Sequence, residues 1–129
     1  MNSRFGLAVI ALVGSAICAS AAQAECKGTN GRGWASGKGQ GEFEMTTKDK
    51  SCKISYVGFI FENPKKRIEA MEVALTKAPS NGTVSIVPGK GLLYTPAAGF
   101  KGKDRFCTKN TTPEVKGQSL RGCITVTVR

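Results

Sequence analysis

Apolar and polar residues alternate along several short segments of this chain. The clearest case is the last segment, where Ile124, Val126 and Val128 are separated by single polar residues. A period of two places successive side chains on opposite faces of a strand, so the pattern predicts a half-buried β-strand. Residues 42–46 and 52–56 alternate in the same way and predict two more strands.

Turn-forming residues separate these segments from further strand patterns. Glycine, proline and asparagine recur at spacings of about 8 to 12 residues, which is typical of proteins built from many short strands. The further predicted strands cover residues 83–86, 91–95 and 104–108. The sequence therefore predicts an all-β fold in which antiparallel strands form a sandwich.

Two apolar segments do not follow the simple alternation. Residues 57–61 form an apolar run interrupted only by Gly58, as expected for a strand that is covered on both faces or bends at the glycine. Residues 65–77 fit two patterns: their apolar residues have helical spacing in part and strand spacing in part, while their Glu, Ala, Met and Leu favour a helix. The pattern therefore allows two alternatives for residues 65–77: a strand, or an amphipathic helix that lies on the sheet.

The first 41 residues divide into two segments of different character. Arg4 precedes a short apolar run that ends in small residues at Ala24, which predicts a cleaved signal peptide over residues 1–24 and a periplasmic or secreted protein. No later apolar stretch is long enough to span a bilayer. Residues 25–41 are rich in glycine and predict an irregular lead-in. The sandwich domain is then expected over residues 42–129.

Charge and cysteine content narrow the possible chemistry. The chain has 19 Lys and Arg against 9 Asp and Glu, a formal net charge of +10, which favours anionic partners, although such charge also serves solubility alone. Four cysteines follow the predicted leader, and an even number in a small exported chain predicts two disulfides with three possible connectivities. The chain has no His, and its cysteines are too widely spaced for a zinc site. These cysteines are Cys26, Cys52, Cys107 and Cys123.

A family resemblance covers residues 78–128. The order of turns, aromatic residues and strands resembles that of bacterial immunoglobulin-like domains of the cadherin-like type. This resemblance implies an antiparallel immunoglobulin-like β-sandwich, and it favours a strand over a helix for residues 65–77. The residues that carry it are Pro79, Gly82, Thr83, Tyr94, Pro96, Gly99, Phe100, Gly102, Asp104 and Phe106.

The resemblance also allows the cysteines to be paired. By alternation, Cys107 and Cys123 lie on the polar faces of their strands. The resemblance places these two strands side by side, so a disulfide between them would be a surface brace within one sheet. Cys26 then pairs with Cys52 and would attach the glycine-rich lead-in to the sandwich.

Asp104 belongs to the same motif and has a structural explanation. Its carboxylate is expected to accept hydrogen bonds from backbone amides at a bend. Calcium, which some members of the family bind, is not expected, because Lys103 and Arg105 flank the single carboxylate. We predict no metal and no cofactor.

The same residue content argues against catalysis. Without His, neither a Ser-His-Asp nor a Cys-His arrangement can form, and oxidised cysteines cannot act as nucleophiles. We therefore expect a non-enzymatic binding module, with a structural subunit or spacer of a cell-envelope assembly as the alternative.

Two groups of basic residues are the candidate anion-binding sites. One group lies after Pro64, on a predicted loop, and the other surrounds the turn at residues 99–102. We expect an anionic envelope polymer or another exported protein as the partner, and not nucleic acid, because few aromatic residues accompany the cations. A charged sheet edge that prevents aggregation is the plainer explanation. The candidate residues are Lys65, Lys66, Arg67, Lys101, Lys103 and Arg105.

Overall fold

The computed structural model describes residues 26–129, and the predicted signal peptide lies outside this range. Within it the chain forms ten β-strands and one short 3-10 helix. All-β structure and two disulfides are thus confirmed. The elements are β1 (Lys27–Thr29), η1 (Trp34–Ser36), β2 (Gly39–Met45), β3 (Cys52–Ile54), β4 (Gly58–Glu62), β5 (Lys65–Glu69), β6 (Glu72–Lys77), β7 (Gly82–Val87), β8 (Gly91–Pro96), β9 (Gly102–Thr111) and β10 (Leu120–Val128).

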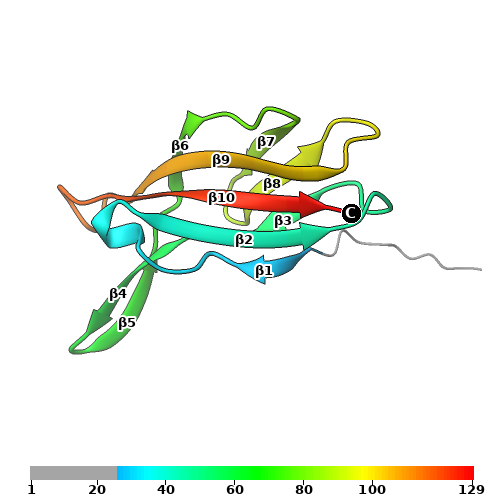
Figure 1. The fold of residues 1–129 in the computed structure, drawn as a ribbon. Coiled ribbons are helices and arrows are strands. Elements are labelled where there is room, and N and C mark those ends of the chain that lie inside the picture. Colours follow the sequence, from blue (N-terminus) through cyan, green and yellow to red (C-terminus); the bar gives the residue numbers. More distant parts are fainter. Residues whose placement is uncertain (1–25) are drawn as a thin grey trace, which may run out of the picture.

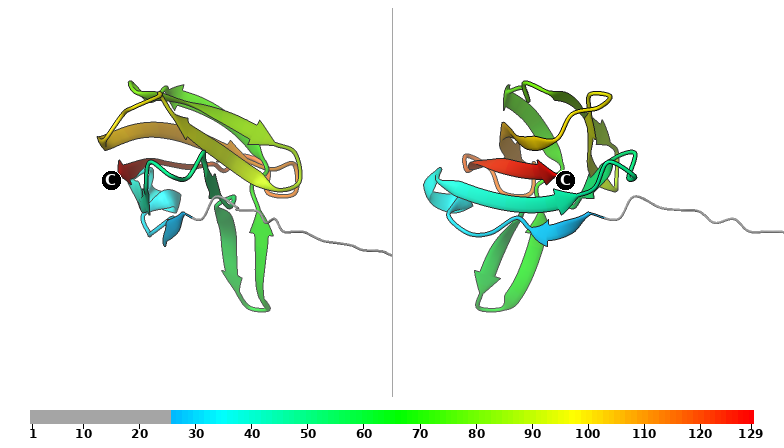
Figure 2. Two further views of the ribbon diagram at one scale, coloured as in Figure 1. Left: turned by 90° about the vertical axis from the view of Figure 1, so that its right-hand side faces the viewer. Right: turned by 45° about the vertical axis from the view of Figure 1, so that its right-hand side comes forward.

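The strands form two layers and a separate hairpin (Figure 1). The larger sheet has the order β1-β2-β10-β9-β6, and the smaller one has the order β3-β8-β7. Their inward side chains meet in a single core, where the rings of Tyr94 and Phe106 stack across the layers with centroids 6.2 Å apart. The two views in Figure 2 show the smaller sheet lying over one face of the larger sheet. The opposite face of the larger sheet is left with its polar side chains outward.

The larger sheet is mixed, whereas the sequence predicted a purely antiparallel fold. β2 pairs with β10 in parallel, with Phe43 opposite Val126, whereas all its other pairings are antiparallel. A parallel pair requires a long connection, and here almost the whole domain connects the two strands. Alternation within a strand indicates which face is buried but not the direction of the neighbouring strand, so this pairing could not be predicted.

Residues 65–77 are extended, as the resemblance implied, and the helical alternative is wrong. They form two strands that belong to different sheets: β5 pairs with β4, and β6 pairs with β9. The chain changes direction at Ala70, which is fully buried, and at Met71. This division explains why no single period fits the segment.

The β4–β5 hairpin projects from the rest of the molecule (Figures 1 and 2). Phe59 packs into the core, but the side chain of Ile60 is 58% exposed. Of the two alternatives given for residues 57–61, coverage on both faces is therefore wrong, because only one face of the hairpin base meets the core.

The glycine-rich lead-in is more ordered than predicted. It contains β1 and η1, and β2 begins at Gly39, before the strand start expected from alternation. The indole of Trp34 is buried against Gly39, where any added Cβ atom would overlap the ring. Its Nε1 donates a hydrogen bond to the carbonyl oxygen of Asn30 at 2.6 Å. Gly39 thus permits close contact between the ring and the sheet. The high glycine content alone indicated only a flexible backbone and did not reveal this contact.

Both predicted disulfides are present. Cys107 and Cys123 lie directly opposite each other on β9 and β10, half-buried on the outer face of the larger sheet. Cys26 precedes β1, and Cys52 lies on β3 and is fully buried. The second bridge therefore links the two layers, whereas the first braces one sheet.

Asp104 has the predicted structural role. It is buried, and its carboxylate accepts hydrogen bonds from the backbone amides of Ser80 and Asn81 at 2.9 and 3.0 Å. The hydroxyl of Tyr94 donates a further hydrogen bond at 2.7 Å. Burial raises the pKa of Tyr94 above its ordinary value, and the hydrogen bond to Asp104 and the negative charge of Asp104 act in the same direction. The carboxylate thus holds the turn before β7 against β9.

Removing the brace between β9 and β10 should lower stability without changing the fold. The double substitution Cys107→Ala and Cys123→Ala opens a loop of about 15 residues. The resulting gain in chain entropy of the unfolded state should lower the free energy of unfolding by roughly 3 kcal/mol. Urea unfolding monitored by circular dichroism measures the change. A loss below about 1 kcal/mol would contradict a bracing role. Replacing Cys26 and Cys52 by Ala should cost more, because the buried Cys52 side chain also leaves a cavity.

Tyr94→Phe should remove the hydrogen bond to Asp104 and cost about 1.5 to 3 kcal/mol at neutral pH. The folded-state pKa of Tyr94 is raised above the unfolded value of 10, so its contribution is complete below pH 10 and declines as the pH rises further. The free energy of unfolding of the Phe variant should therefore fall less steeply above pH 10. Parallel stability curves for the two proteins in this range would contradict the assignment.

Candidate anion-binding face

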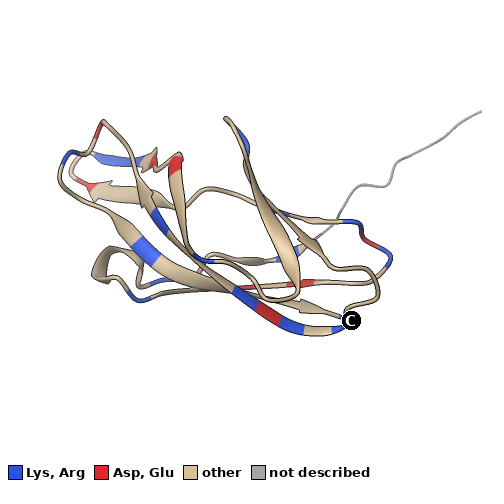
Figure 3. Cartoon of the chain, turned by 90° about the horizontal axis from the view of Figure 1, so that it is seen from above, with Lys and Arg blue, Asp and Glu red and all other residues tan. Residues whose placement is uncertain are grey.

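The outer face of the larger sheet carries a row of basic residues along β9. Lys103, Arg105 and Lys109 alternate with the buried side chains of the same strand, so they point away from the core. Side chains on one face of a strand repeat about every 6.8 Å. Figure 3 shows basic positions recurring along β9, the strand that begins beside the C-terminus. The row is a set of cation donors at regular intervals.

The neighbouring strands extend this row sideways. In the register of the sheet, Lys109 lies directly opposite Arg121 of β10, and Cys107 lies opposite Lys77 of β6. Among residues 26–129, the two ion pairs present are Arg67 with Glu69 and Arg129 with Glu44, so none of the cations on this part of the face has a carboxylate partner. Like charges that lie directly opposite across a sheet destabilise it. We define the basic face as Lys77, Lys103, Arg105, Lys109 and Arg121.

The charge on this sheet is unevenly distributed. The outward positions of β2 include Glu42 and Glu44, which lie opposite Thr125 and Thr127 of β10. Beside Arg105 and Lys103, the acidic residues are thus separated from the β9 row by Thr125 and Thr127 of β10. The basic face is therefore bounded on the β2 side by hydroxyl groups and then by carboxylates.

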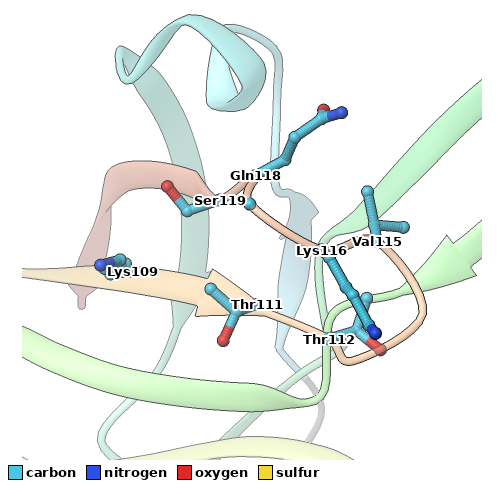
Figure 4. A pocket seen from close by; sticks show the side chains of 8 residues that line it. Lys109, Thr111, Thr112, Val115, Lys116, Gln118 and Ser119 are labelled. Carbon is cyan, nitrogen blue, oxygen red and sulfur yellow. The ribbon is translucent and has the colours of Figure 1, made fainter.

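A polar pocket of about 300 Å³ lies where the basic face meets the loop between β9 and β10. Lys109 and Lys116 are the only charged residues in its wall, and the other groups are mainly hydroxyl and amide groups of the loop. Figure 4 shows the side chains of Thr111, Ser119 and Gln118 coming from both sides of this loop. Ammonium and hydroxyl donors together suit a phosphate, sulfate or carboxylate group.

The predicted site residues lie in two separate places. Lys103 and Arg105 share the outer face of β9, and Lys101 lies just before the strand and is exposed. Lys65, Lys66 and Arg67 are on β5, not on a loop as predicted, because residues 63 and 64 alone form the hairpin turn. The hairpin projects from the end of the molecule opposite to the start of β9, so the two predicted groups are not brought together (Figure 1).

The β5 cations are partly engaged within the hairpin. The guanidinium of Arg67 donates hydrogen bonds to the carbonyl oxygen of Tyr56 at 2.8 Å and to Glu69 at 3.1 Å. The ammonium of Lys66 lies 5.7 Å from the centre of the Phe61 ring. Arg67 thus fixes the hairpin base and is a poor candidate for an anion ligand.

The other members of the basic face were missed by local sequence reasoning. Lys109 has the same strand parity as Arg105, which was a usable signal. Arg121 could have been found from the predicted disulfide. If Cys107 faces Cys123 in an antiparallel pair, the residue two positions after Cys107, which is Lys109, faces the residue two positions before Cys123, which is Arg121. Lys77 and Lys116 carry no such signal. Lys77 ends a segment for which the sequence allowed both helix and strand, and Lys116 lies in a loop.

The part of the chain that the structure describes contains no cluster of three or more His, Cys, Asp or Glu residues that could hold a metal ion. It also contains no helix with the length and apolarity needed to cross a membrane. In comparisons with known proteins, no family model and no curated protein matches this chain. The site therefore has to be interpreted from its own geometry.

Arg121→Glu should make the folded protein more stable. The substitution replaces the repulsion between Arg121 and Lys109 by an attraction. Cross-strand pairs of opposite charge typically raise the free energy of unfolding by about 0.2 to 1 kcal/mol. Thermal unfolding at low ionic strength measures the gain, and added salt should reduce it. Arg129→Glu is the control, because Arg129 already pairs with Glu44 at 3.3 Å and its reversal should destabilise the protein. Destabilisation by both substitutions would contradict repulsion between Lys109 and Arg121.

Proposed function

We propose that this chain is an exported, non-catalytic binding domain whose basic face binds an anionic polymer of the cell envelope. In this proposal the domain is immunoglobulin-like. Support comes from the two packed layers and from the places of three residues of the motif, although each of these places also has a plain structural cause. Tyr94 and Phe106 stack in the core, and Asp104 binds turn amides. Export is supported by the leader-like sequence and by the two disulfides, which suit an oxidising compartment.

The observation that carries the proposal is the like-charge pair of Lys109 and Arg121. These residues lie directly opposite each other and have no carboxylate partner within the described residues. Charge needed only for solubility could be spread over the surface without this repulsion. An anionic ligand would neutralise both side chains at once, so repulsion in the free protein favours binding.

The spacing of the cations favours a polymer over a small ligand. Successive outward positions on β9 are about 6.8 Å apart, and the row continues from Lys103 to the pocket at Lys109. A chain with repeated negative charges can contact several of these cations at once, which raises its overall affinity. The pocket beside Lys116 would take a charged group at one end of the bound segment.

The test compares two triple variants that remove the same charge. Lys103→Gln, Arg105→Gln and Lys109→Gln alter the basic face, whereas the control variant carries Lys65→Gln, Lys66→Gln and Lys90→Gln. The immobilised oxidised protein is titrated with polyphosphate, polygalacturonate and neutral dextran at low salt. We expect binding of the two anionic polymers, roughly tenfold weaker after the basic-face change than in the control, and lost by about 0.5 M salt.

Equal losses in the two triple variants would show that only net charge matters and would contradict the proposed face. Binding of neutral dextran, or binding that resists salt, would contradict the electrostatic mechanism. Salt-insensitive co-purification with a single envelope protein, without polymer binding, would favour the structural subunit or spacer instead.

A further inference from the structure

A second concave surface lies far from the start of the β9 row. A groove of about 380 Å³ separates the β4–β5 hairpin from the segment that carries η1. The loop before β10 and the first residue of that strand complete its wall. We call this surface the hairpin groove, and its main lining residues are Arg32, Trp34, Phe59, Ile60, Phe61 and Leu120.

The lining of the hairpin groove is apolar and aromatic with one charge. Arg32 is the only ionisable residue in the lining, and it is exposed. Ile60 is also at the lip of the groove and is the most exposed large apolar side chain of the described residues. Aromatic residues together with Arg are enriched at the energetically important positions of protein interfaces. No carboxylate opposes Arg32 within the lining, so the groove complements a ligand that combines apolar and acidic groups.

The backbone of β4 adds a second recognition element. Four consecutive β4 residues, Gly58 to Phe61, line the groove, which therefore runs along the strand. Among the described residues β4 pairs with β5 alone, so its other edge keeps unpaired amides and carbonyls. Such an edge can accept an extended peptide as an additional strand.

Contacts at the hairpin base fix the wall of the groove that the hairpin forms. The guanidinium of Arg67 binds the carbonyl oxygen of Tyr56, and the amide of Ala70 donates to the carbonyl oxygen of Val57 at 2.9 Å. Gly58 lets the Arg67 side chain cross the strand, because a Cβ atom there would lie 2.8 Å from it. A preformed site loses less entropy on binding than a flexible one.

We propose that the hairpin groove binds an extended acidic segment of another exported protein. The segment pairs with the free edge of β4, places an apolar side chain against Phe59 and Phe61, and sets a carboxylate beside Arg32. Charge complementarity favours this occupant over a second copy of the chain, because two copies of a chain so rich in Lys and Arg repel each other. The proposal is independent of polymer binding at the basic face.

The experiment selects peptides against the intact, oxidised protein. A library of random linear peptides of about ten residues, longer than a typical strand, is panned on immobilised protein. We expect enrichment of sequences that alternate apolar residues and contain Asp or Glu. A fluorescent copy of the most enriched peptide then measures affinity. Arg32→Glu and Ile60→Lys should each weaken its binding roughly tenfold.

Two matched variants control for charge and apolar surface elsewhere. Ile86→Lys changes another exposed apolar residue, and Arg121→Glu changes the basic face. Both should leave the affinity for the peptide within about twofold of the original. Arg121→Glu should still weaken binding of polyphosphate, so failure of one proposal is distinguishable from failure of the other.

Four results would overturn the proposal. The first two are a selection that enriches no peptide and a selection that enriches peptides without acidic residues. The third is a peptide affinity that Ile60→Lys leaves unchanged. The fourth is an equal loss of affinity in the groove variants and in the two control variants. Sedimentation that reveals a dimer abolished by Ile60→Lys would assign the groove to a second copy instead. Binding to phosphatidylglycerol-containing vesicles that is abolished by Ile60→Lys, without peptide binding, would assign it to a lipid surface.

Discussion

The pairing of β9 with β10 determines most of what this molecule can do. Nine residue pairs lie in register from Val128 and Gly102 to Leu120 and Asn110, and Cys107 and Cys123 fix that register covalently. Every second residue of β9 points into the core, including Asp104 and Phe106, and the residues between them carry the basic face. A shift of one residue would exchange these two faces, so the core and the candidate site depend on the same alignment.

The two faces of β9 make opposite contributions to stability. On the inner side, the Asp104 carboxylate is satisfied by Tyr94 and by turn amides, and such a buried group is stabilising only while its partners are present. On the outer side, Lys109 and Arg121 repel each other without a carboxylate partner in the described range. The disulfide beside that pair holds the strands together despite the repulsion. This combination is typical of a binding surface, where local stability is lower than it could be.

Sequence reasoning succeeded where local patterns decide the structure. Alternation identified β2, β3 and β10, and with the family resemblance it paired all four cysteines. The tendency of Asp to bond backbone amides at a bend explained Asp104. Sequence reasoning failed where distant segments meet. The parallel contact of β2 with β10 and the division of residues 65–77 between two sheets depend on tertiary packing. For the same reason, Lys77 was not recognised as a neighbour of the β9 row. Two other misses were local: Arg121 could have been derived from the predicted disulfide, and the two-residue hairpin turn puts Lys65, Lys66 and Arg67 on a strand instead of a loop.

The central claim is that the outward side chains of β9 and β10 form one anion-binding surface. Titration of the isotope-labelled, oxidised protein with polyphosphate, followed by two-dimensional NMR, tests it residue by residue. The account predicts the largest shift changes at Lys103, Arg105, Lys109, Lys116 and Arg121, with the β4–β5 hairpin unchanged. Changes concentrated on Lys65 and Lys66, or spread evenly over all exposed lysines, would contradict it.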